Sequence, residues 1–125
     1  MNKRIPAFFA VLCLLFALCA PGAAQCAEYI DKNTAVVRIM NKAAGKTQVA
    51  TVPVGRAAEF EKLDIMVRAC KETPPYEMKD FFMFVEISKK TANNQQIFSG
   101  WMTANEPGDN PLQDADYDLW LVRCE

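Results

Sequence analysis

Near the C-terminus the chain reads Tyr117-Asp118-Leu119-Trp120-Leu121-Val122-Arg123-Cys124, a run of apolar and β-forming residues that ends in a cysteine. A strand this apolar must lie against a hydrophobic core. A similar run, Leu63-Asp64-Ile65-Met66-Val67-Arg68-Ala69-Cys70, also ends in a cysteine. We therefore predict a small β-domain in which a disulfide between Cys70 and Cys124 joins the ends of these two strands.

Strict alternation along the Leu63 run places Leu63, Ile65, Val67 and Ala69 on one face and Cys70 on the other. We therefore expect the disulfide near a strand end or a sheet margin and not in the centre of the core, unless a β-bulge redirects Cys70. The alternative to a disulfide is a pair of buried free thiols, which an oxidising compartment disfavours.

The start of the chain has the features of a secretory signal peptide. Lys3 and Arg4 are basic, the run from Phe8 to Ala20 is uncharged and apolar, and small residues follow it. We predict residues 1–24 as a signal peptide whose end lies between positions 24 and 27. The position of that end decides whether Cys26 is retained, and lipid attachment at Cys26 is a minor alternative. The apolar run is shorter than the roughly 20 residues of a spanning helix, so no transmembrane span is expected after cleavage.

Residues 28–125 form one predicted domain, which we expect to be periplasmic or secreted. Without residues 1–24 the chain keeps 12 basic and 15 acidic residues and a net charge of −3. We therefore expect no nucleic acid among its partners. The chain contains no histidine, which is the usual base beside a serine or cysteine nucleophile. We predict that the protein is not an enzyme and uses no cofactor; acid–base work by paired carboxylates is the alternative.

The remaining pattern predicts an all-β fold, a single small antiparallel sandwich or barrel of about six strands. Pro53 favours a strand end or an edge strand, and Gly100 indicates a bulge or a close backbone approach. Residues 81–85 are apolar on both faces, which suits a central strand. The segment 28–33 is predicted as a polar lead-in and 58–60 as a short strand. The main strands are expected at 34–41, 47–54, 63–70, 80–88, 96–102 and 117–124.

Residues 103–116 are the longest irregular segment, and loops of this length are usually functional or disordered. Asp114, Asp116 and Asp118 alternate, and Glu125 follows at the twelfth position, which is the ligand spacing of a calcium-binding loop. The sixth position is Leu119, where that loop requires glycine. We therefore predict no metal site and interpret these side chains as acids of a solvated loop. A looser calcium site between residues 106 and 116 is the alternative.

Trp101 and Trp120 stand in predicted strands, where single aromatic residues usually fill the core. The alternative is an exposed aromatic platform for a sugar or a peptide. The candidate interaction surface consists of Trp101, Glu106, Asp109, Asp114 and Asp116.

Two C-terminal motifs carry a family resemblance. The runs Ile97-Phe98-Ser99-Gly100-Trp101-Met102 and Tyr117 to Cys124 are similar to those of a bacterial family called domain of unknown function 2155. Upstream, Pro53-Val54-Gly55 and the Leu63 to Cys70 strand resemble that family too. The family usually has Glu-His-Pro shortly before the tyrosine, whereas this chain reads Gln113-Asp114-Ala115. The resemblance implies an exported envelope protein and implies no activity.

We therefore predict an exported periplasmic or cell-envelope β-domain that acts as a non-catalytic binding or interaction module. Its partner would be an envelope protein or a cell-wall component. One alternative is an inhibitor of a cell-wall hydrolase, for which residues 103–116 should protrude as a rigid wedge. Another is an accessory factor of outer-membrane or envelope assembly, which should have an open sheet edge or an exposed apolar patch. An enzyme should have a deep cleft with convergent polar groups.

Overall fold

The computed structural model describes residue 22 and residues 28–91 and 93–125. The predicted signal peptide, apart from Gly22, and the retention of Cys26 therefore lie outside the described residues. Across the described ranges, no helix is both long enough and apolar enough to cross a membrane.

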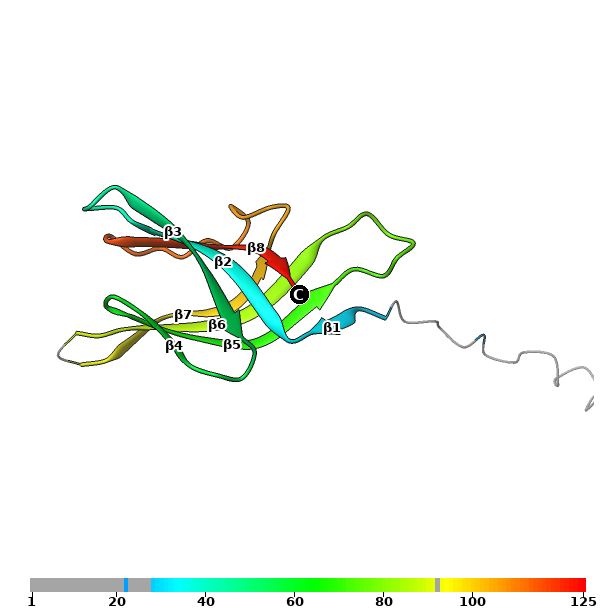
Figure 1. The fold of residues 1–125 in the computed structure, drawn as a ribbon, viewed down its shortest axis with the longest axis horizontal. Helices are drawn as coiled ribbons and strands as arrows, with labels where there is room; N and C mark the ends of the chain where they lie inside the picture. Colours follow the sequence, from blue (N-terminus) through cyan, green and yellow to red (C-terminus); the bar gives the residue numbers. More distant parts are fainter. Residues whose placement is uncertain (1–21, 23–27, 92) are drawn as a thin grey trace, which may run out of the picture.

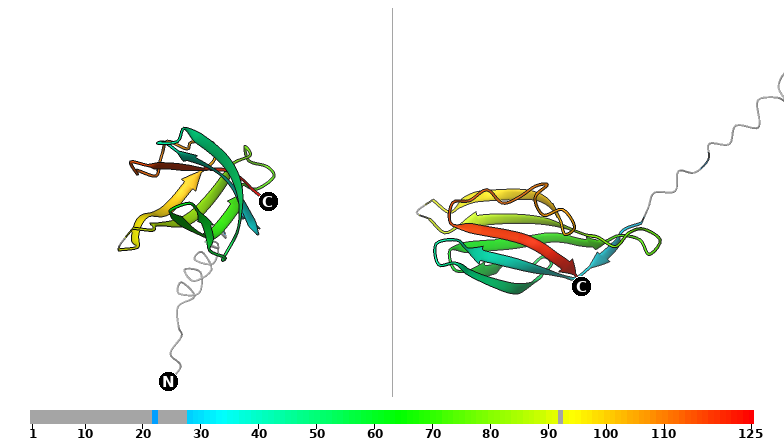
Figure 2. Two further views of the ribbon diagram at one scale, coloured as in Figure 1. Left: turned by 60° about the vertical axis from the view of Figure 1, so that its left-hand side comes forward. Right: turned by 90° about the horizontal axis from the view of Figure 1, so that it is seen from above.

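In this part of the chain, eight β-strands form two antiparallel sheets that face each other (Figures 1 and 2). Sheet A has the strand order β1-β5-β6-β7, with β4 also paired to β5, and sheet B has the order β3-β2-β8. The all-β prediction is confirmed. The strands are β1 (Ile30–Lys32), β2 (Thr34–Asn41), β3 (Lys46–Pro53), β4 (Ala58–Phe60), β5 (Leu63–Glu72), β6 (Phe81–Lys89), β7 (Gln95–Thr103) and β8 (Tyr117–Cys124).

Two three-residue strands explain why the count exceeds the predicted six. Both β1 and β4 pair with the outer edge of β5, β1 near its end and β4 near its start. The segment predicted as a lead-in is thus β1, which brings residue 29 onto sheet A. The chain passes from sheet A to sheet B at Asn33, whose N–H donates to the Glu125 carbonyl at 3.2 Å. A short polar segment gains β structure here because β5 offers unpaired backbone groups.

The predicted hairpin of β2 and β3 is confirmed, with Thr34 opposite Pro53 and Asn41 opposite Lys46. Pro53 ends β3, which is an edge strand of sheet B. Both features follow from the missing N–H of proline. Gly45 lies in the connecting turn with φ +64°, a conformation that glycine adopts without steric cost.

The core lies between the two sheets and is built from alternate residues of their strands. The central strand β6, paired with β5 and β7, contributes Met83, Val85 and Ile87, all with no exposed surface. From sheet B, Leu119 and Leu121 are 2% and 1% exposed. Burying one such side chain stabilises the fold by about 1.5–3 kcal/mol. The inter-sheet core is therefore the main source of stability.

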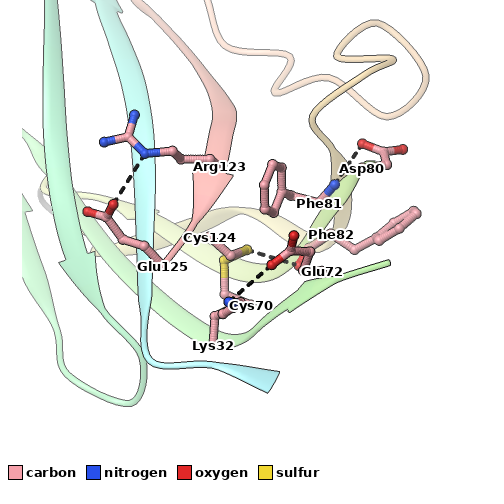
Figure 3. The surroundings of a disulfide bond; sticks show 9 residues. All are labelled: Lys32, Cys70, Glu72, Asp80, Phe81, Phe82, Arg123, Cys124 and Glu125. Atoms are coloured by element: carbon pink, nitrogen blue, oxygen red, sulfur yellow. Dashed lines mark hydrogen bonds and ion pairs between the residues drawn. A yellow bond between two sulfur atoms is a disulfide. The ribbon is translucent and has the colours of Figure 1, made fainter. Parts of the chain in front are cut away.

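Cys70 and Cys124 are disulfide-bonded, with their Cα atoms 5.7 Å apart, so the predicted pairing is confirmed (Figure 3). The bond links β5 of sheet A to β8 of sheet B. The expected position near a strand end is confirmed, because Cys124 is the last residue of β8 and Cys70 lies two residues before the end of β5. The outward orientation expected of Cys70 is wrong, because Cys70 and Cys124 are 1% and 4% exposed and belong to the core.

β-Bulges explain the inward position of both cysteines. In β5 the register shifts between Val67 and Ala69, so Arg68 is an extra residue. In β8, Val36 pairs with Arg123 but Val37 pairs with Leu121, so Val122 is extra. One extra residue inverts the alternation that follows it. The bulges at Arg68 and Val122 therefore direct both sulfur atoms into the core.

The loop of residues 104–116 runs alongside β7 and β8 and is anchored at several points (Figure 2). Asn110 Nδ2 donates to the Trp101 carbonyl at 2.9 Å, and Leu112 is buried. No bulge lies at Gly100, which pairs in regular register with Val85. The atom that approaches it is a side-chain amide and not backbone, since a Cβ atom on Gly100 would lie 3.1 Å from Asn110 Nδ2. Residues 105–111 of the loop are exposed, while Asn110 and Leu112 attach it to β7 and to the core.

Candidate functional site

Aromatic side chains gather on the outer face of sheet A. Because Met83 and Val85 of β6 point into the core, their neighbours Phe82 and Phe84 point outward. Phe84 lies opposite Trp101 of β7, and their ring centroids are 5.5 Å apart in an edge-to-face arrangement. Tyr29 packs edge-to-face on Phe82 at the same centroid distance of 5.5 Å. Such pairs hold the four rings in defined orientations.

These rings border an open groove of about 280 Å³ that is lined by Tyr29, Lys71, Phe82 and Trp101. We call it the aromatic groove. Tyr29 and Trp101 are each 45% exposed. The Lys71 ammonium is held by Asp31 at 2.8 Å, so the aliphatic part of Lys71 and the three rings form the apolar floor.

The expectation that the tryptophans fill the core is wrong. Trp101 is exposed on the outer face of sheet A. Trp120 is half-buried and lies opposite the exposed Arg38 on the outer face of sheet B. Their neighbours Met102 and Leu121 are buried instead. Alternation gives each strand one inward face, and smaller apolar residues occupy it in both strands.

A second hollow of about 520 Å³ adjoins the groove and shares Tyr29 and Phe82 with it. We call it the acidic hollow, because three carboxylates line it. Its full lining is Tyr29, Thr73, Glu77, Met78, Asp80, Phe82, Asn105 and Glu106. Asp80 Oδ1 accepts the N–H groups of Phe81 and Asn105 at 2.7 and 3.0 Å. Asp80 thereby holds the beginning of the 104–116 loop, and with it Glu106, beside β6.

The carboxylates of Glu77, Asp80 and Glu106 form no ion pair with any lysine or arginine that the structure describes. Two nearby cations, Lys32 on β1 and Lys79 just before β6, have another partner. Lys32 and Lys79 both pair with Glu72, at 3.0 and 3.4 Å (the Lys32 pair is drawn in Figure 3). The hydrogen bond from Lys32 is the main cause that lowers the pKa of Glu72, while burial opposes the shift and Lys79 adds to it. The acidic hollow is therefore a negative region beside an apolar groove.

At the opposite end of the sandwich, Lys89 pairs with both Asp114 and Asp116. Asp114 Oδ2 also accepts the N–H groups of Asp116 and Tyr117 at 3.0 and 3.1 Å. Burial opposes ionisation of Asp114, but these hydrogen bonds and the one from Lys89 outweigh it and hold the pKa of Asp114 below its usual value. Hydrogen bonding to Asp116 and Asp114 correspondingly raises the pKa of Lys89. This cluster fixes the entry of the chain into β8.

A polar cavity of about 360 Å³ lies near this cluster, with Glu61 and Tyr117 in its wall. Glu61 has φ +49° in the turn between β4 and β5, which is uncommon for a residue with a side chain. Tyr117 Oη and Asn41 Nδ2 donate to Glu61 Oε2 at 3.0 and 2.7 Å. Burial is the main cause that raises the pKa of Tyr117, and the Glu61 hydrogen bond adds to it. The Tyr117 phenol therefore stays protonated and ties the β4–β5 turn to β8, while Asn41 ties the same turn to β2.

The residues of the predicted interaction surface lie in separate places. Trp101 lines the aromatic groove and Glu106 the adjoining acidic hollow. Asp109 is exposed in the loop that connects β7 to β8. Asp114 and Asp116 pair with Lys89 at the opposite end of the sandwich. In the described residues, no group of three or more cysteine, aspartate or glutamate side chains is arranged to hold a metal ion.

Sequence reasoning missed Tyr29, Glu77, Met78 and Phe82 as parts of this surface. A signal for Phe82 was present, since residues 81–85 are apolar on both faces. A two-layer sandwich covers only one face of each sheet, so a second apolar face must be exposed or covered by another molecule. Tyr29 had no such signal, because its position depends on the pairing of β1 with β5.

The fold and the groove define a class: a two-sheet, disulfide-linked β-domain with an exposed aromatic surface. Within that class the chain belongs to the family described as "Uncharacterized protein conserved in bacteria (DUF2155)", whose model matches residues 35–124. The family resemblance of the sequence motifs is thus confirmed. The matched range contains both bonded cysteines, Phe82 and Trp101. No curated protein and no solved structure matches the chain.

Proposed function

We propose that this protein is an exported, non-catalytic binding domain of the bacterial cell envelope and that it holds its partner in the aromatic groove. The observation that carries the proposal is the exposure of ordered aromatic rings on the solvent face of sheet A. Contiguous exposed apolar surface is characteristic of interaction sites. The partner is an envelope protein or a cell-wall component.

The groove suits binding energetically as well as chemically. Aromatic side chains have only two rotatable angles, so ordering them on binding costs little entropy. The pairs Tyr29–Phe82 and Phe84–Trp101 already restrict the rings before a partner arrives. Each Å² of apolar surface that a partner covers contributes about 25 cal/mol. A modest contact area on a preorganised surface of this kind supports specific binding.

Among the alternative functions, the exposed apolar groove favours an accessory factor of envelope assembly. An inhibitor of a cell-wall hydrolase is less favoured, because the exposed residues 105–111 of the loop contain no aromatic residue, and aromatic anchors usually carry the binding energy of an interface. The accessory-factor function is therefore our second candidate.

The non-catalytic part of the proposal is supported by the lack of histidine in the chain and by the bonding of Cys70 to Cys124. Glu61, whose side chain lines the polar cavity, has a hydrogen-bonding role in joining strands. We expect purified protein to leave cell-wall and peptide substrates intact. Turnover that disappears on Glu61→Gln or on another single carboxylate substitution would show that the protein is an enzyme.

Site-specific photocrosslinking in living cells tests the binding site. A benzophenone amino acid is placed at Trp101 in the aromatic groove and, as the control, at Val49, which is 51% exposed on β3 of sheet B. We expect a discrete crosslinked partner from position 101 and none from position 49. Equal or absent crosslinking at the two positions would exclude the groove as the binding site.

Export is tested by mass spectrometry of the protein from expressing cells. The basic start and apolar run predict a mature N-terminus between Gln25 and Glu28. An intact Met1 in a membrane fraction would contradict export.

A further inference from the structure

We infer that the partner of the aromatic groove is an extended peptide segment in which a lysine or arginine stands beside apolar residues or proline. This inference rests on the proposed function, since it names the chemistry of the partner at the same site. It follows from the length of the aromatic surface and from the charge of the hollow that continues it.

The groove has the dimensions of a short extended peptide. It crosses sheet A from Trp101 on β7, over Phe82 on β6 and Lys71 on β5, to Tyr29 beside β1. Neighbouring strands are about 4.8 Å apart, so three spacings give roughly 14 Å. About four extended residues span that length at approximately 3.3 Å each. Aromatic-lined grooves of this kind accept extended segments with proline or other apolar side chains.

The acidic hollow gives the peptide its charge. It shares Tyr29 and Phe82 with the groove, so a segment lying on the rings reaches Glu77 and Glu106 within one or two further residues. Neither carboxylate is paired with a cation of the described chain, whereas the nearby Lys71 is paired with Asp31. A lysine or arginine side chain fits this junction, because its aliphatic stem packs on apolar surface while its charge reaches the carboxylates.

The same features disfavour an anionic envelope glycan. Three unpaired carboxylates repel negative charge, and the groove floor offers few hydrogen-bonding groups for sugar hydroxyls. Lys71, the one cation among the described residues that line the groove, is engaged by Asp31. A basic peptide is attracted by the carboxylates and does not need hydrogen-bonding groups on the groove floor, so charge complementarity favours it over an anionic glycan.

Peptide selection tests the inference without knowledge of the natural partner. Random eight-residue peptides displayed on phage are selected on the purified protein and counter-selected on Trp101→Ala, with circular dichroism verifying that the variant is folded. We expect the selected peptides to be enriched in lysine or arginine next to aromatic, aliphatic or proline residues. Selected peptides without an excess of basic residues would overturn the inference.

Affinities of one selected peptide, measured by fluorescence polarisation, then locate the two parts of the site. Trp101→Ala should weaken binding about thirtyfold, as expected on removal of an aromatic anchor. Glu77→Gln/Glu106→Gln should weaken it roughly fivefold, the effect of losing two exposed charge pairs. The control, Glu59→Gln/Asp118→Asn, removes the same charge from β4 and β8, and should leave affinity within about twofold.

The outcomes separate this inference from the proposed function. Equal effects of the two double variants would overturn the basic-peptide inference while leaving the groove as a binding site. A failure to select any Trp101-dependent peptide, together with crosslinking from position 101 in cells, would show that the partner is not a basic peptide. Failure of both experiments would overturn both proposals.

Discussion

Breaking the Cys70–Cys124 bond should remove a large share of the stability of this domain. The bond closes a loop with a sequence separation of 54, for which the chain-entropy model gives about 4 kcal/mol. A domain of this size has a total free energy of unfolding of roughly 5–15 kcal/mol. The bond also joins the two sheets and ties down the last strand, because Cys124 ends β8. We therefore expect Cys124→Ser to lower the free energy of unfolding by about 2–5 kcal/mol.

A double-mutant cycle separates the link from local packing. Cys70→Ala and Cys124→Ala each break the same bond, so the double variant loses the link only once. Equilibrium urea unfolding, followed by far-UV circular dichroism, should give a coupling energy of about 4 kcal/mol between the two sites. Strictly additive single effects, or single effects below about 1 kcal/mol, would refute the reasoning. Non-reducing peptide mapping verifies the linkage, and a main species that contains Cys26 would contradict the assigned pairing.

Three further predictions use matched variants. Gly100→Ala should lower the free energy of unfolding by about 0.5–1.5 kcal/mol, because the added methyl group displaces the Asn110 hydrogen bond. The control Gly108→Ala has open space around it and should leave the free energy of unfolding nearly unchanged in the same urea assay. Equal losses from the two variants would contradict the close approach of Asn110 to Gly100. Trp101→Ala should cost less than about 1 kcal/mol because the ring is outside the core, while Leu121→Ala should cost about 2–5 kcal/mol, and a reversed order would contradict the outward orientation. The pKa of Asp114 is lowered on folding. The charged carboxylate therefore stabilises the fold fully when the pH is above the pKa of aspartate in the unfolded chain, about 3.9. This stabilisation is lost as the pH falls through the lower pKa of Asp114 in the folded protein. The difference in urea midpoint between the wild type and Asp114→Asn should therefore shrink below about pH 4, and a constant difference from pH 6 to pH 3 would contradict this.

Most of the strands and the identity of the disulfide partners could be derived from the sequence because both depend on local patterns. Alternation with a period of two marks β-strands wherever they occur. The strand β8 lies at 117–124 as its run of apolar and β-forming residues predicts, and the β2–β3 hairpin lies where its turn residues place it. Cys70 and Cys124 could be paired because each ends an apolar run of this kind in the sequence.

The orientation of the cysteines was decided only by the tertiary structure. A β-bulge is a mismatch between two paired strands, so it depends on the partner as well as on the strand itself. Arg68 is extra only relative to β6, and Val122 only relative to β2. Neither strand's own sequence reveals its extra residue. Strict alternation along the Leu63 run therefore placed Cys70 on the wrong face.

The candidate site was likewise assembled by pairing between distant segments. The sequence determined that β6 carries apolar residues on both faces, but which face the second sheet covers depends on the packing of β2, β3 and β8. Trp101 and Glu106 lie beside Tyr29 because β1 pairs with β5 and because Asp80 holds Asn105. Asp114, only a few residues further on, is carried to the opposite end of the sandwich by its ion pair with Lys89. Local alternation thus determined the strands of this protein, whereas long-range pairing decided which of their faces remained open to a partner.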